Sequence, residues 1–213
     1  MSAGDPLPLG SAPRRGHLRM FSTSIERALS LALLDHDERT QAGARQPAQA
    51  VRPLHVALML ARWEQDEAVI VAALAHGIAA GSAAWNAQRL EQQFGRHVAA
   101  LVAELDGGVT LESAARAPER LEELARLSPQ AATIQAVEVL HDLHQLHAEL
   151  RGASDADAVW ARFAGGSASA LAGAAALAQA LGRRVEHRVA RALSAAVRSL
   201  SDRQRPASVG PRS

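Results

Sequence analysis

The stretch AVIVAALAHGIAA, residues 68–80, is apolar on every side of a helix. Such a helix is stable only when other elements surround it, so we predict a buried central helix from Glu67 to Ala80. We expect its most buried positions to pack on apolar side chains of the neighbouring helices. These positions are Val69, Ile70, Ala73 and Leu74, and their expected neighbours are Leu29, Leu33, Leu58 and the helix from Phe94 to Leu101.

Helical periodicity continues on both sides of this stretch, whereas no segment alternates with the period of two that is typical of a strand. Two helices are predicted before it, from Thr23 to about His36 and from Pro53 to about Ala61. Further helices are expected at 85–105, 110–124, 128–150, 155–163, 167–181 and 184–200. The sequence therefore predicts an all-α domain, a bundle of about eight helices without a sheet, over residues 21–200.

The two ends of the chain differ in composition from this domain. Residues 1–20 are rich in Pro, Gly and Arg and lack periodicity, so we predict a disordered tail, with Met1 or Met20 as the natural start. Residues 201–213 are predicted to form a disordered basic tail. Residues 183–213 carry a net charge of +6 and residues 20–182 one of −7. An acidic body with a basic end argues against nucleic acid as the partner.

Composition also limits the chemistry. The chain has no cysteine, so His, Asp and Glu would have to supply any metal ligands. No apolar run approaches the roughly 18 residues that a membrane span needs, and we predict a cytoplasmic protein.

Four blocks follow one another in an informative order: ALLDHDERTQ at 32–41, RPLHVALMLA at 52–61, VAALAHGIAAGS at 71–82 and LEQQFGRHVAALVAEL at 90–105. A later helix reads VEVLHDLHQL at 137–146, and Trp160 follows. In these blocks the chain resembles the HD-superfamily hydrolases that break down guanosine tetraphosphate, the RelA/SpoT type. The resemblance covers roughly residues 23–195 and implies an HD-domain-like helical bundle.

The resemblance also implies a metal site, normally for manganese, which this sequence matches only in part. His36 matches the first ligand, but Arg52 stands where the family has the His of a His-Pro pair, and a fixed cation cannot coordinate a metal. His76 is present, whereas the adjoining Asp is Gly77, and His141 occupies the position of the final Asp ligand. If that pocket were still open, an Asp restored at position 77 should be tolerated far better than an Asp at position 74.

The catalytic and nucleotide positions are altered as well. Ala80 and Gly81 stand where the family has Glu and Asp, so no side chain there can orient the attacking water. Glu138 replaces a Lys, and Gln145 replaces an Asn that the family places near the nucleotide. Arg39, Arg52 and Gln145 are the ligand-binding candidates that the resemblance implies, and a guanine nucleotide or a protein is the partner that it implies.

Three functions stay open at this point. The first is a degenerate relative of the alarmone hydrolases, with no cofactor, that acts as a binding or regulatory module. The second is an active phosphohydrolase whose metal is held by His36, His76 and His141, or by His55; a site made of histidines alone would favour zinc. The third is an unrelated helical interaction protein. Measured metal content separates the first two, and the packing of the helices tests the third.

Overall fold

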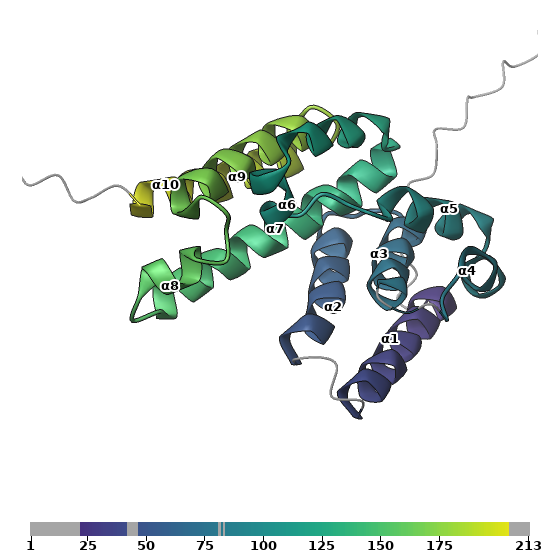
Figure 1. Cartoon of the computed structure of the whole chain (residues 1–213). Helices are drawn as coiled ribbons and strands as arrows, with labels where there is room; N and C mark the ends of the chain where they lie inside the picture. Colours follow the sequence, from purple (N-terminus) through teal and green to yellow (C-terminus); the bar gives the residue numbers. More distant parts are fainter. Residues whose placement is uncertain (1–21, 42–46, 81, 83, 205–213) are drawn as a thin grey trace, which may run out of the picture.

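The long helix α7 (Pro129–Gly152) lies between two groups of helices and contributes to the core of both (Figure 1). The structure, a computed structural model, describes residues 22–41, 47–80, 82 and 84–204, and the backbone alone for 35–41, 47–50 and 118. Every regular element in these ranges is a helix, ten of them α-helices and one a 3₁₀ helix. The predicted all-α fold without a sheet is confirmed.

The first group of helices surrounds α3. It comprises α1 (Thr23–Gln41), α2 (Pro47–Arg62), α3 (Glu67–Ala79), α4 (Ala87–Phe94) and α5 (Arg96–Leu105). Helices α1, α2 and α5 pack directly on α3, which in turn contacts α7. The four positions predicted to be most buried on α3 are at most 2% exposed. The apolar stretch is therefore the central core element of this group, as predicted from its composition.

The second group lies on the other side of α7 and has its own core. It comprises α6 (Leu111–Arg116), η1 (Pro118–Arg126), α8 (Ala156–Trp160), α9 (Gly166–Gly182) and α10 (His187–Gln204). Leu177 of α9 and Leu193 of α10 are fully buried in this core. The guanidinium of Arg188 at the start of α10 donates to the carbonyl of Trp63, which ties the second group to the first.

Two predicted helix starts are confirmed by their caps. The Thr110 hydroxyl accepts a hydrogen bond from the Ser113 amide at 3.1 Å and begins α6, and the Ser128 hydroxyl accepts one from the Ala131 amide at 3.2 Å. These bonds satisfy amides that have no partner inside the helix. At α1 the cap is Ser22, whose hydroxyl accepts from the Ile25 amide.

Two of the predicted helices are each divided into two elements. The chain turns at Gly95, between α4 and α5, with φ of 85°, a conformation that glycine adopts without the strain that a side chain would cause. The helix begun at Thr110 ends at Arg116, just before Pro118, and continues as the 3₁₀ helix η1. A proline lacks the amide that would continue the α-helical ladder.

The predicted start of α2 and the predicted contacts of Leu33 and Leu58 are wrong. Helix α2 begins at Pro47, so Pro53 lies inside it. Its buried side chains are those of Val56, Ala57 and Leu60, and this face points Leu58 away from the core with 63% of its surface exposed. Leu33 is 55% exposed because α1 packs on α3 through Ala28.

The ends of the chain are described only in part. Helix α10 ends at Gln204 rather than at the predicted Leu200, so residues 201–204 belong to the helix and not to a disordered tail. The predictions for residues 1–20 and for 205–213 lie outside the described residues. Among the described helices, none has the length and apolar character that crossing a membrane requires.

Candidate functional site

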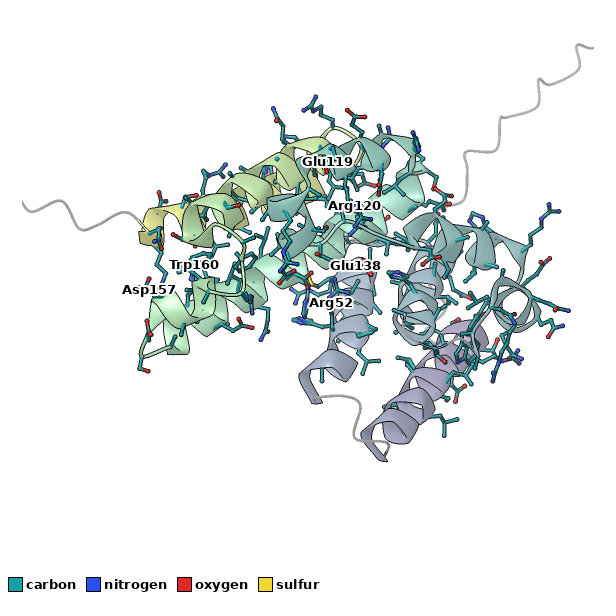
Figure 2. All side chains as sticks on the ribbon, in the orientation of Figure 1. Arg52, Glu119, Arg120, Glu138, Asp157 and Trp160 are labelled. Carbon is teal, nitrogen blue, oxygen red and sulfur yellow. The ribbon has the colours of Figure 1, made fainter. Side chains whose placement is uncertain are left out.

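A pocket of about 460 Å³ lies where α2, α3 and α7 meet the segment that precedes α6. Its charged and polar lining includes Arg52 from α2, His76 from α3, and Gln135, Glu138 and Asp142 from α7. Arg120 of η1 lies on the opposite side, where its guanidinium donates to the Gly107 carbonyl. Figure 2 shows Arg52 and Glu138 next to each other, with Arg120 nearby. Both groups of helices thus contribute to one pocket.

The strongest polar contact in this pocket joins α2 to α7. Arg52 Nε donates to Asp142 Oδ1 at 2.8 Å, and Arg52 Nη2 donates to Asp142 Oδ2 at 3.0 Å. Two parallel hydrogen bonds between a guanidinium and a carboxylate combine charge with fixed geometry, and they are stronger than bonds between neutral groups. The side chain of Arg52 is 32% exposed and that of Asp142 is 24% exposed, so water weakens this pair only in part.

Glu138 lies deeper, one helical turn before Asp142. Its carboxylate is within 3.0 Å of His76 Nδ1 and 3.7 Å of Arg52 Nη1, and its side chain is 6% exposed. A carboxylate as buried as this requires partners, because removing it from water without them is costly. Arg52 therefore faces two carboxylates on the same side of α7, and His76 completes the cluster from α3.

The pKa values of the ion pair follow from these contacts. Burial alone would lower the pKa of Arg52, but the hydrogen bond and charge of Asp142, with the charge of Glu138, raise it above its ordinary range. Burial alone would raise the pKa of Asp142, but hydrogen bonds from His141 and Arg52 hold it below its ordinary value. Near neutral pH, Arg52 is thus a cation and Asp142 an anion.

Acid should weaken the fold through Asp142. A carboxyl group whose pKa is lower in the folded chain than the unfolded value of about 3.9 contributes stability that is fully present well above that value. The contribution is lost as the pH falls through the folded pKa, because the unfolded chain then binds more protons. We expect the free energy of unfolding, measured in urea, to decline below about pH 5. Asp142→Asn should flatten this decline, whereas the same change at the exposed Asp106 should leave it as steep as in the wild type.

Position 77 has no room for a side chain. A Cβ atom built on Gly77 would lie 2.3 Å from Cγ and 2.5 Å from Cβ of Pro53. The expectation that an Asp at position 77 would enter an open pocket is therefore wrong, because the proline ring of α2 fills that place. The absence of a side chain at Gly77 lets α2 approach α3 closely.

Gly77→Ala should therefore destabilise the protein even though alanine favours helices. The new methyl group must displace a rigid ring on a packed helix, and overpacking of this kind costs typically 1 to 3 kcal/mol. The gain in helix propensity, about 1 kcal/mol, offsets only part of that cost. We expect a net loss of about 1 kcal/mol in urea denaturation. The control is Gly152→Ala, at the end of α7, where an added Cβ meets nothing within 4 Å; equal stability of the two variants would contradict the close contact.

The histidines predicted to hold a metal have separate partners. His76 Nδ1 lies beside Glu138, and His141 Nδ1 is 3.3 Å from Asp142 Oδ1. The rings of His55 and His141 meet edge to face, with centroids 5.2 Å apart. The side chain of His36 lies outside the described residues. Among the side chains that the structure describes, no three His, Asp or Glu residues are arranged to hold a metal ion. The three-histidine site stays a prediction.

Of the predicted ligand-binding and catalytic residues that the structure describes, only some line the pocket. Arg52 and Ala80 line the pocket. Gln145 is exposed on α7, with Nε2 3.4 Å from Glu149 Oε1, and does not line the pocket. The side chain of Arg39 and residue Gly81 lie outside the described part of the chain. A role for Arg39 and Gln145 in ligand binding stays a prediction.

Glu138 and Asp142 were not predicted from the sequence as partners of Arg52. Glu138 was compared with a family lysine, and His141, rather than its neighbour Asp142, was placed in the site. One signal was present: Glu138 and Asp142 are four residues apart, which puts both on the same side of a helix, and Glu138 interrupts a run of apolar residues. Arg52, the partner of both carboxylates, is 90 residues from Asp142 in sequence, so their contact depends on the packing of α2 on α7.

Comparison with known proteins identifies the domain. A family model described as HD domain matches residues 28–167, about two thirds of the chain, from α1 to the start of α9. The matched region contains every residue of the pocket described above. No curated protein matches the sequence. The match excludes an unrelated helical protein, and the chain belongs to the HD-domain family.

Proposed function

We propose that this chain is a catalytically degenerate HD-domain protein, related to the guanosine tetraphosphate hydrolases of the RelA/SpoT type, that acts as a binding or regulatory module. The observation that carries the proposal is the ion-pair cluster of Arg52 with Asp142 and Glu138, which occupies the pocket between the two groups of helices. An arginine that is committed to two carboxylates contributes no ligand to a metal, and the family's hydrolysis needs a metal.

Two described residues beside this cluster, Gly77 and Ala80, lack the side chains that the family uses, which supports the same conclusion. Gly77 has no ligand atom and is packed against Pro53, so the His-Asp pair of the family has no counterpart on α3. Ala80, which also lines the pocket, has no side-chain group that can take a proton from water. Without an activated water and without a metal to neutralise phosphate charge, hydrolysis of a phosphate ester loses both of its main contributions.

The charges of the pocket set a condition on any ligand. Two arginines, Arg52 and Arg120, face three carboxylates, those of Glu112, Glu138 and Asp142, so the lining carries a net charge of −1 when His76 is neutral. The phosphates of a guanine nucleotide would therefore meet more negative than positive charge. A guanine nucleotide would therefore have to bind mainly through its base and ribose. This restriction does not apply to a protein partner, because a protein need not bring phosphates into the pocket.

The proposal predicts no turnover. Purified protein with manganese and guanosine tetraphosphate should release no pyrophosphate above the buffer level, while an active hydrolase of the RelA/SpoT type does so in parallel. Metal-dependent release that disappears in a His76→Ala variant would contradict the proposal and would favour the rearranged histidine site. Calorimetric titration with guanosine tetraphosphate and with guanosine, without metal, then tests the binding role: the condition above predicts that guanosine binds at least as tightly as the tetraphosphate.

A further inference from the structure

The structure assigns to the Arg52 guanidinium the role that a divalent metal has in HD domains: we propose that it is the built-in cation that holds Glu138 and Asp142 in place and links α2 to α7. This inference rests on the proposed function in one respect, since both require that the wild-type pocket holds no metal. The further step is that the Arg52 guanidinium has replaced the metal, so that removing this guanidinium should open a metal site.

The two carboxylates of α7 need a cation. Glu138 is almost completely buried, and Asp142 is three quarters buried beside it. Two neighbouring carboxylates that are removed from water repel each other, and each loses hydration energy, unless a positive charge lies between them. Arg52 supplies this charge at any pH, because a guanidinium does not lose its proton in proteins. Its planar fork also fits a carboxylate through two hydrogen bonds, as it does here with Asp142.

The residues present do not fit a metal while Arg52 is in place. Both oxygens of Asp142 accept hydrogen bonds from the guanidinium, and Glu138 is shared between His76 and Arg52. A metal would also have to enter beside a fixed positive charge, which opposes its binding. Among the described side chains the remaining His, Asp and Glu residues form no group that could hold an ion. The guanidinium therefore excludes the metal and replaces its charge.

Substitution of Arg52 tests this directly. Arg52→His removes the cation, shortens the side chain and adds a neutral nitrogen donor to His76, Glu138 and Asp142, a mixed set of nitrogen and oxygen ligands that suits zinc or manganese. The readout is the melting temperature with and without each metal chloride. At a metal concentration about a hundredfold above Kd, we expect a rise of roughly 5 to 10 °C for Arg52→His and none for the wild type.

Arg162→His is the matched control. Arg162 also contacts two carboxylates, those of Glu149 at 2.7 Å and Glu112 at 3.8 Å, but these three side chains are each at least one third exposed. Among the described side chains, no histidine is hydrogen-bonded to Glu149 or Glu112 in the way that His76 is to Glu138. We expect no metal-dependent rise in this variant. The inference is overturned if Arg52→His shows no rise, if the control rises equally, or if the wild type itself is stabilised by metal.

A second measurement needs no metal and covers the case in which Arg52→His does not fold. Arg52→Met, Asp142→Asn and the double variant form a cycle of melting temperatures. If Arg52 neutralises the Asp142 carboxylate, the melting temperature of the double variant should be higher than the two single losses added together predict. The double variant removes both charges of the pair, so neither charge is left without a partner. Additive losses would overturn the inference. Pyrophosphate release by the wild type, in contrast, would contradict the proposed function, so the two failures can be told apart.

Discussion

Leu74→Asp should cost the protein most of its stability. Leu74 is fully buried in the middle of α3, where helices α1, α2 and α5 pack around it. A carboxylate at this position would have no partner and no water, and a change of this type costs on the order of 4 to 5 kcal/mol or more. Urea denaturation followed by circular dichroism measures the loss. Because a domain is stable by only about 5 to 15 kcal/mol, the variant should be largely unfolded at moderate urea concentration.

Leu58→Asp is the matched control for this prediction. The same substitution is made in the same group of helices, but Leu58 is exposed on the outer face of α2. We expect a change within about 0.5 kcal/mol, as for other surface positions. Similar losses in the two variants would mean that the outer face of α2 is covered in solution and that the assignment of the buried face is wrong.

Arg52→Met should cause the second largest loss, about 2 to 3 kcal/mol. Breaking a fully buried ion pair by removing one partner costs about 3 to 5 kcal/mol, and exposed pairs contribute about 1 kcal/mol or less. Arg52 lies between these limits because about one third of its side chain is exposed. The variant leaves Glu138 with His76 alone and leaves Asp142 without its guanidinium. Denaturation at pH 7 measures the loss.

Arg162→Met tests whether burial is the cause. Arg162 makes an equally short contact with Glu149, at 2.7 Å, but the pair is more exposed than Arg52 and Asp142. Its removal should change the free energy of unfolding by about 0.5 kcal/mol or less. If both variants lose the same amount, the stability of the Arg52 cluster does not come from its position inside the pocket.

Helix content and the main core could be predicted from local patterns. Residues 69–75 of the apolar run are buried on all sides, and Thr110 and Ser128 cap the helices that were predicted to begin there. Such features depend on near neighbours in the sequence. The buried face of α2 was mispredicted because almost every residue from 54 to 61 is apolar, so periodicity alone does not select Val56, Ala57 and Leu60. The packing of α2 on α3 and α7 decides which of these residues face inward.

Two predicted site residues, Arg52 and His76, line the pocket, but their contacts were not predicted. Arg52, Gly77 and Ala80 were recognised as replacements for metal-site residues, and Arg52 also as a ligand-binding candidate, but no contact with another helix was predicted for any of them. The structure gives two of them a positive role: Arg52 binds Asp142, and Gly77 accommodates the ring of Pro53. Arg52 and Asp142 are 90 residues apart, and Gly77 and Pro53 belong to two different helices, so no pattern within one helix specifies either contact. The sequence shows that Arg52 replaces a metal ligand, but its partner Asp142 is known only from the packing of α2 on α7.

A manganese titration of the wild-type protein, followed by electron paramagnetic resonance, shows whether the pocket beside Arg52 binds a metal ion. Free Mn²⁺ in solution has a sharp signal that broadens when the ion is bound, so the measurement counts bound ions without requiring a substrate. We expect the free signal to grow in proportion to the added metal from the first addition. One equivalent of bound Mn²⁺ that is lost in His76→Ala would contradict this expectation, because it would show that the pocket still holds the family's metal beside Arg52.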